Sequence, residues 1–404
     1  MTRWRYLYAG TLVLAFVIGL GLWSPLKPAD ASRSHVPRFR VDPFWPKPLP
    51  VDPASGKPWV TGEVAGTCVH SRDHVFTVNR GNLVAPETVV GVASPPVLEF
   101  DREGNVVNAW GDRNILPNGL HGCFVDYQDN VWIAGNGDGI VQKYSHDGHL
   151  LLQIGTRGVC DNPPANTCGN SGANPAANMS HTRLNQPADI AVDPTNGDIY
   201  IADGYGNHRV VVFNSAGVFL RQWGSSGTGP GQFQPTDGGH PHCVVISNEG
   251  LVYACDRGSD RIQVFDKQGH LQRIIPVIPG TGAGGLGTAG SAWDVDFSPD
   301  KKQKFMYDTD GGDEVLWIFD RALGAILGGF GRPGHQAGEF TFLHTLAVDS
   351  KGTLYLGETV GGRRIQKFKE DGDVPEDKLD VFIPAGNTSM RLLHYEPVKG
   401  GDDD

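Results

Sequence analysis

A unit of about forty residues recurs along this chain, and this repetition constrains the fold more than any other feature of the sequence. The clearest copy runs from Gln186 to Gly224 and holds four strand-like stretches, DIAV, DIYIA, RVVVF and FLRQW. Asn, Asp and Gly turns separate these stretches, as in a four-stranded antiparallel blade. The same pattern returns five more times. Six such units predict an all-β chain folded as a six-bladed β-propeller.

The rest of the sequence agrees with an all-β fold, because no stretch shows a sustained helical period. The formal net charge of −11 without a basic patch argues against a nucleic-acid surface. We expect the following division of the chain: a signal peptide or N-terminal anchor at 1–31, a proline-rich lead-in at 32–60, the propeller at 61–390 and an acidic C-terminal tail at 391–404.

The first residues predict export. Arg3 and Arg5 precede an apolar run at 6–23, and Ala29 to Ala31 offer a small-residue cleavage site. The pattern favours cleavage after Ala31 and a periplasmic or secreted protein. Retention of residues 6–23 as a membrane anchor is the alternative, because the run is nearly long enough to span a bilayer. A membrane would be a partner only in that second case.

Six cysteines in an exported chain can form disulfides. Three pairs are possible. Cys160 and Cys168 would close a Gly/Asn/Pro-rich insertion, and Cys243 and Cys255 flank a hairpin. Cys68 and Cys123 occupy similar positions in neighbouring units. For the second and third pairs, buried free thiols are an equal alternative, because spacing alone does not fix pairing.

Three histidines occur at the same point of the repeat, in every second unit. They are His121 in LHGCFVD, His242 in PHCVVIS and His344 in LHTLAVD. Because the inner strands of a propeller line its channel, alternate blades would bring these imidazoles together about one point. Three neutral imidazoles with room for a further ligand are typical of a catalytic zinc site. The alternative is that they pack in the channel, bonded to water or backbone.

The intervening units supply no ligand at this position, which holds Ala65, Ala188 and Trp293 instead. Histidines placed at random would not skip blades in this way. The occurrence of histidine in every second unit therefore favours a metal site over unrelated histidines in the core.

Two arginines and a tyrosine follow the next strand of their units. Arg80 lies in unit one, Tyr205 in unit three and Arg257 in unit four. Units one and four are opposite in a six-fold ring, so we expect two guanidinium groups to face each other across the metal. Arginine suits carboxylate recognition, which predicts a small anionic or peptide substrate, and Tyr205 as phenolate would be a general base. Ion pairs to neighbouring aspartates and simple packing are the alternatives.

These residues resemble those of the peptidyl-α-hydroxyglycine α-amidating lyase family, whose catalytic domain is a six-bladed propeller of NHL-type repeats. The similarity covers residues 61–368 and is most specific in LPNGLHG, ADGYGNHRV, HPHCV, DRGSDRIQVF and LHTLAVD. The resemblance assigns six positions: zinc ligands His121, His242 and His344, catalytic Tyr205, and active-site Arg80 and Arg257.

The resemblance implies a carbon–nitrogen lyase that cleaves the N–Cα bond of a C-terminal peptidyl-α-hydroxyglycine, or of a similar anionic hemiaminal, to an amide and glyoxylate. Two departures matter. Thr345 stands where the family has an aspartate that helps to bind a structural calcium, so zinc is expected and calcium is doubtful. Gly206 replaces a cysteine beside the tyrosine, so the corresponding disulfide is absent. We expect a monomer.

Two other functions compete with this one. A non-enzymatic NHL-repeat scaffold that binds a protein or glycan would have no need for three phased histidines. A six-bladed lactonase-type hydrolase would use carboxylate and asparagine ligands to calcium, and the imidazole-rich position argues against it.

Overall fold

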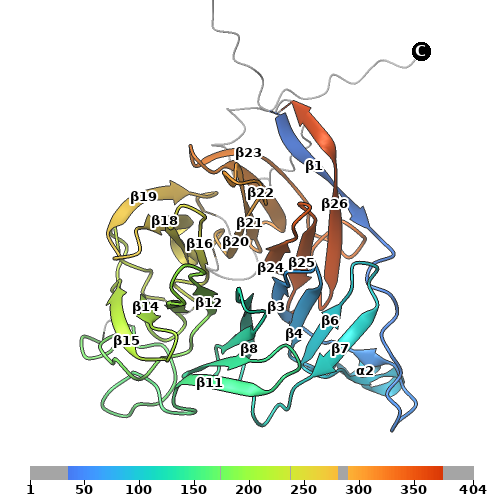
Figure 1. The fold of residues 1–404 in the computed structure, drawn as a ribbon, viewed down its shortest axis with the longest axis horizontal. Helices are drawn as coiled ribbons and strands as arrows, with labels where there is room; N and C mark the ends of the chain where they lie inside the picture. The colour runs from blue at the N-terminus through green and yellow to red at the C-terminus, as the bar shows by residue number, and fades with distance from the viewer. Residues whose placement is uncertain (1–34, 173, 237, 281–289, 376–404) are drawn as a thin grey trace, which may run out of the picture. The chain divides into compact units, whose positions relative to one another are not determined.

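The structure, a computed structural model, describes residues 35–172, 174–236, 238–280 and 290–375. Six four-stranded sheets make up this part of the chain. Figure 1 shows them around a common centre, and contacts between inner strands run in sequence around the ring from β3 through β8, β12, β16, β20 and β24 back to β3. The prediction of a six-bladed propeller is confirmed. The expected leader at 1–31 and tail at 391–404 lie outside the described residues.

In blades one to three, chain order runs from the inner strand outward. Blade one holds β3 (Val64–Val69), β4 (Val75–Asn79), β6 (Val97–Phe100) and β7 (Val106–Trp110). Blade two holds β8 (Leu120–Val125), β9 (Val131–Gly135), β10 (Ile140–Tyr144) and β11 (Leu150–Gly155). Blade three holds β12 (Asp189–Val192), β13 (Ile199–Asp203), β14 (Arg209–Phe213) and β15 (Phe219–Trp223).

The remaining blades follow the same order, with one exception in the last. Blade four holds β16 (Val244–Ile246), β17 (Val252–Asp256), β18 (Arg261–Phe265) and β19 (Leu271–Pro276). Blade five holds β20 (Asp294–Phe297), β21 (Phe305–Asp310), β22 (Val315–Asp320) and β23 (Ala325–Phe330). Blade six holds β24 (Leu343–Val348), β25 (Leu354–Glu358), β26 (Ile365–Pro375) and, outermost, β1 (His35–Asp42).

Strand β1 joins the two ends of the ring, because it comes from the N-terminal side of the chain and pairs with β26. The lead-in at 32–60 thus contributes a strand to the propeller. The repeat pattern does not reveal it, because its partner is at the other end of the sequence. A helix α2 (Ala85–Val90), a 3-10 turn η1 (Arg257–Ser259) and the short parallel pair β2 (Trp59–Val60) and β5 (Val92–Ala93) complete the described elements.

Apolar side chains pack between neighbouring blades. In blade three, Ile190 pairs with Ile201 and Ile201 with Val211, so their side chains share one face of the sheet. One cluster joins Tyr253 of blade four to Trp317 of blade five, both with no exposed surface. Burial of such large side chains contributes on the order of 2 to 3 kcal/mol each, so the packing between blades stabilises the ring.

All six cysteines form disulfides, which confirms the three predicted pairs. One links blades one and two, one closes the insertion, and one lies within blade four. They are Cys68–Cys123, Cys160–Cys168 and Cys243–Cys255. Three disulfides are characteristic of proteins from oxidising, exported environments. No helix in the described ranges is long and apolar enough to cross a membrane.

Candidate metal centre

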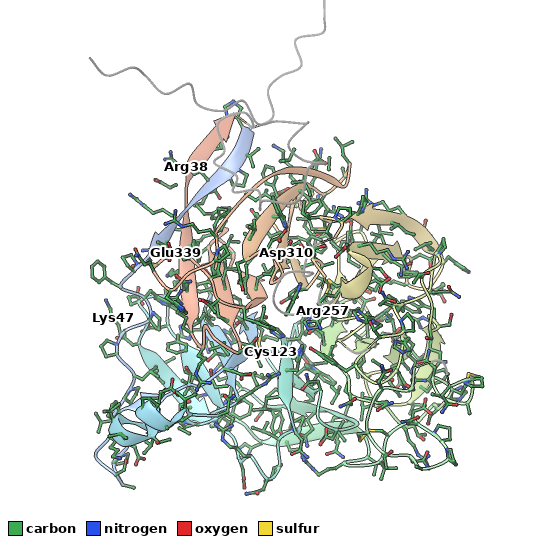
Figure 2. The ribbon with its side chains drawn as sticks, turned by 180° about the vertical axis from the view of Figure 1, so that it is seen from behind. Arg38, Lys47, Cys123, Arg257, Asp310 and Glu339 are labelled. Carbon is green, nitrogen blue, oxygen red and sulfur yellow. A yellow bond between two sulfur atoms is a disulfide. The ribbon has the colours of Figure 1, made fainter. Side chains whose placement is uncertain are left out.

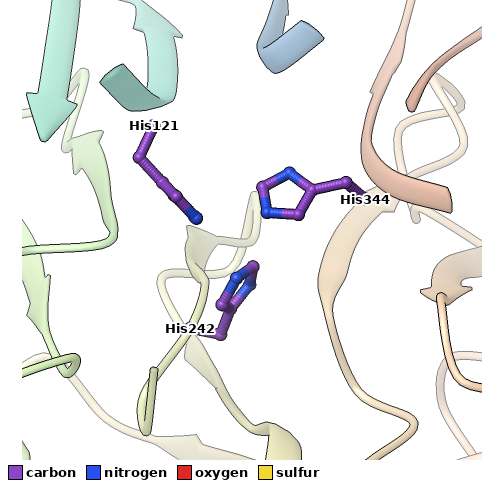
Figure 3. Close-up of side chains that lie close together, drawn as sticks. All are labelled: His121, His242 and His344. Atoms are coloured by element: carbon purple, nitrogen blue, oxygen red, sulfur yellow. The ribbon is translucent and has the colours of Figure 1, made fainter. Parts of the chain in front are cut away.

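The three histidines of the even blades converge on one point of the channel. His121 lies in β8, His344 in β24, and His242 just before β16. Figure 3 shows the rings pointing toward one another, and one nitrogen of each lies within 4.8 Å of the others. The side chains are buried, and ring centroids are 4.6 to 5.1 Å apart. Among the described residues, this is the one group of three or more potential ligands close enough to hold a metal ion.

Backbone irregularities direct two of these side chains to the axis. The ladder between β8 and β9 shifts register between Leu120 and Cys123, and the ladder between β24 and β25 shifts between Leu343 and Thr345. Such bulges bend a strand and change the direction of a side chain. His121 and His344 therefore leave the regular alternation of their strands and face the channel.

Odd blades orient the histidines through backbone carbonyls. Nδ1 of His121 lies 2.8 Å from the carbonyl oxygen of Ala188, and Nδ1 of His242 lies 2.6 Å from that of Trp293. A carbonyl only accepts, so these Nδ1 atoms carry the proton and each Nε2 keeps its lone pair. The carbonyl of Ala65 acts on His344 in the same way, although Nδ1 of His344 makes no hydrogen bond of normal geometry.

Gly122 lets blades two and three approach at this point. Its N–H donates to the Ala188 carbonyl at 2.9 Å, the same oxygen that accepts from His121. A Cβ at this position would lie 2.5 Å from that oxygen, closer than real Cβ contacts. Glycine is therefore required for the carbonyl to reach the imidazole.

Burial keeps the imidazoles neutral. It lowers the pKa of His121 to about 3, with a further contribution from the positive charge of Arg80. The pKa values of His242 and His344 are also well below the ordinary value, again chiefly because of burial. Neutral imidazoles are the form that binds metal ions, so the ligands need not lose protons at neutral pH.

The side chain of Tyr205, two residues after the end of β13, extends to the point where the three histidines converge. Its hydroxyl oxygen lies 3.0 Å from Nε2 of His121 and 3.1 Å from Nε2 of His242. A phenol has one proton, so it can donate to only one of these two lone pairs. The site therefore has fewer donors than acceptors, a deficit that a bound cation would remove.

Arg257 is a buried cation beside the histidines. Its guanidinium lies 4.1 Å from the ring centroid of Trp293 and 5.8 Å from that of Tyr205. Burial lowers its pKa, and its Nε has no hydrogen-bond partner. It interacts with the hydroxyl of Tyr205, and no carboxylate pairs with it in the described part of the chain. Figure 2 places Arg257 near the centre of the ring, where an anionic group would neutralise it.

Arg80 has different surroundings, although the sequence suggested that the two arginines are equivalent. Its Nη1 lies 2.6 Å from a carboxylate oxygen of Glu63, and its Nε donates to the carbonyl of Leu120 at 3.0 Å. The charge of Arg80 is already balanced, whereas that of Arg257 is not. Nothing in the repeat pattern marks Glu63, because it precedes β3 in a segment without a counterpart in the other units.

The inner strands also enclose a cavity of about 150 Å³ lined by the three histidines and by Asp189 and Asp294. Burial raises the pKa of Asp294 to about 6, and burial together with repulsion from Asp294 raises that of Asp189 well above its ordinary value. Thr345, in place of the family's calcium-binding aspartate, donates its hydroxyl to Asp294 at 2.9 Å. Neither acid was predicted as a site residue from the sequence, although both directly follow the odd-blade residues at the histidine position.

Comparisons with known proteins agree with the fold. The NHL repeat family matches residues 184–213, in blade three. NHL repeat-containing protein 3 of Mus musculus is 28% identical over 355 residues, 83% of this chain and 85% of that protein. A probable peptidyl-alpha-hydroxyglycine alpha-amidating lyase of Caenorhabditis elegans is 22% identical over 321 residues, 76% of this chain and 82% of that protein.

A third relative is much longer than the region it shares with this chain. Peptidyl-glycine alpha-amidating monooxygenase B of Xenopus laevis is 27% identical over 310 residues, which cover 72% of this chain but 31% of that protein. The resemblance inferred from the histidine, tyrosine and arginine motifs is therefore confirmed: this chain is an NHL-repeat β-propeller with relatives among the peptidyl-α-hydroxyglycine α-amidating lyases.

Proposed function

We propose that this protein is a zinc-dependent lyase that cleaves the N–Cα bond of a C-terminal peptidyl-α-hydroxyglycine, or of a similar anionic hemiaminal, to an amide and glyoxylate. The convergence of three buried imidazole nitrogens within 4.8 Å of one another carries this proposal. The Caenorhabditis elegans relative, whose name refers to this lyase reaction, supports it.

His121, His242 and His344 would hold the zinc, since each can offer a lone pair toward the centre. The shortage of hydrogen-bond donors around Tyr205 agrees with a cation at this place. When bound, zinc would supply Lewis acidity toward the hydroxyl group of the substrate.

Tyr205 and Arg257 would supply the two other functions, proton transfer and binding of the substrate carboxylate. As a phenolate, the Tyr205 oxygen, which lies near His121 and His242, would accept the proton of the substrate hydroxyl. The C–O bond then becomes the carbonyl of glyoxylate, the N–Cα bond breaks, and the amide nitrogen takes the electron pair and a proton. Arg257 would hold the substrate carboxylate, because its buried charge has no carboxylate partner among the described residues.

A glyoxylate assay with the zinc-loaded protein and an N-acyl-α-hydroxyglycine peptide tests this proposal. We expect turnover in the unsubstituted protein and none in His242→Ala or Tyr205→Phe. Matched controls are His270→Ala and Tyr127→Phe, whose side chains are exposed and outside the channel. Tight zinc binding without glyoxylate would exclude this substrate, and absence of zinc binding would exclude the enzyme.

A non-enzymatic scaffold is the second candidate. The mouse relative, which covers most of this chain, has a name that refers to its repeats alone. A scaffold would tolerate loss of the histidines, so a partner bound equally well by His242→Ala would favour it. We also propose export, in agreement with the three disulfides, and a monomer, which size-exclusion chromatography with light scattering would test.

A further inference from the structure

A second cavity lies beside the metal centre, between blades one and two. It has a volume of about 240 Å³ and is lined by Arg80, Arg113, Leu116, Pro117 and Leu120, among others. A cavity of about 150 Å³ is enough to hold benzene in a protein interior. This one can therefore accept a substantial aliphatic or aromatic side chain.

The cavity borders the proposed site directly. Its wall residue Leu120 precedes the zinc ligand His121, and the Leu120 carbonyl accepts from Nε of Arg80. Arg80 is close enough to the metal centre that its charge lowers the pKa values of His121 and His344. Arg80 therefore belongs to the lining of the cavity and also lies near the histidines.

The lining combines an apolar floor with the positive charge of Arg113, which is exposed to solvent. Leu116 and Leu120 are buried in the apolar cluster between the blades. Arg113 donates to the carbonyls of Asn79, Arg80 and Ser94 at 2.7 to 3.1 Å, and no carboxylate pairs with it in the part of the chain that the structure describes. Such a lining favours apolar groups and repels cations.

The walls are held in place before any ligand arrives. Arg157 donates to the carbonyl of Leu116 at 2.8 Å, and Asp138 accepts from the backbone N–H of Asn118 at 3.2 Å. Gly81, with φ of +62°, lets the Arg113 guanidinium lie against the backbone, since a Cβ there would meet it. A preformed pocket binds a side chain without an ordering cost.

We propose that this cavity binds the side chain of the residue that precedes the reacting glycine, and that it selects apolar residues over basic ones. This inference rests on the proposed function. It names the peptide class that the lyase would prefer, one with an apolar penultimate residue.

The test compares N-acetyl-Leu-α-hydroxyglycine, N-acetyl-Lys-α-hydroxyglycine and N-acetyl-α-hydroxyglycine, which lacks the penultimate residue. We expect kcat/KM for the Leu substrate to exceed that for the Lys substrate by about tenfold or more. Arg113→Gln should raise turnover of the Lys substrate, and Asn118→Phe, at an exposed position of the lining, should lower turnover of the Leu substrate alone. Arg273→Gln is the matched control, because Arg273 also binds backbone carbonyls but lies in blade four.

Binding measurements separate the two proposals. N-acetyl-Leu-glycine and N-acetyl-Lys-glycine lack the hydroxyl and are not cleaved, so calorimetry with them reports on the cavity without turnover. An affinity about tenfold higher for the Leu compound, reduced in Asn118→Phe, supports the cavity even if no glyoxylate forms. Equal affinities, or turnover of all three substrates at equal efficiency, would overturn the inference and leave the proposed reaction intact.

Discussion

Even and odd blades share one fold but present different atoms to the channel. The even blades place imidazoles at the start of the inner strand, whereas the odd blades place a backbone carbonyl at the same position. Each imidazole depends on the blade that follows it: His121 on Ala188, His242 on Trp293, and His344 on Ala65 across the closure. The six-fold ring thus presents three imidazoles, each beside a carbonyl group of the next blade.

The largest expected effect comes from removing an even-blade ligand. His242→Ala should reduce zinc affinity and glyoxylate production by about a thousandfold or more, because two imidazoles make an incomplete site. Ala188→Gly is the odd-blade counterpart. It keeps the backbone carbonyl that accepts from His121, so the zinc affinity should stay within about threefold of that of the unsubstituted protein. Metal analysis and kcat/KM check both. Equal losses in the two variants would contradict the division between blades.

A separate effect is expected for the odd-blade tyrosine. Tyr205→Phe should lower kcat by about a hundredfold to ten-thousandfold with unchanged zinc content, because the ring is not a ligand in this scheme but its hydroxyl moves a proton. The assay is single-turnover glyoxylate formation. Loss of zinc in this variant would show instead that the phenol belongs to the metal site.

A smaller effect should follow from disturbing one junction between an even and an odd blade. Gly122→Ala places a methyl group against the Ala188 carbonyl and shifts it from His121. We expect zinc affinity to fall by about tenfold to a hundredfold, as for other losses of ligand orientation. Competition with a zinc chelator measures this. A change in the melting temperature of the metal-free protein without a change in zinc affinity would refute the orienting role of the carbonyl.

The smallest effect concerns the acids of odd blade five. Burial raises the pKa of Asp296 to about 7. Between about pH 4 and pH 7 the folded state therefore binds a proton that the unfolded state has released, and stability must fall as pH rises through this window. Urea unfolding in chelator should show a loss on the order of 2 kcal/mol, and Asp296→Asn should flatten the profile. An unchanged profile in that variant would assign the pH dependence elsewhere.

The sequence was sufficient for the fold and for the convergence of the three histidines, because both depend on repetition. The strand stretches from Gln186 to Gly224 recur in phase, and so do the histidines. Features that depend on departures from the repeat pattern could not be predicted from the sequence. The bulge at His121 and the pairing of Arg80 with Glu63 lie within single units but depart from the regular strand pattern. The carboxylate of Asp294 contacts Thr345 of the next blade, which a single copy of the repeat does not encode.

The pairing of β1 with β26 has a consequence for biosynthesis. Blade six carries His344 and takes its outer strand from the opposite terminus. A chain still emerging from the ribosome can shape the first five blades and display two imidazoles, but it has no third until nearly the last strand is made. Only then can β1 pair with β26 and close the ring of blades. Closure of the ring is therefore a late event in the life of the molecule, and a chain that ended before β26 would lack the partner of β1 and remain an open arc.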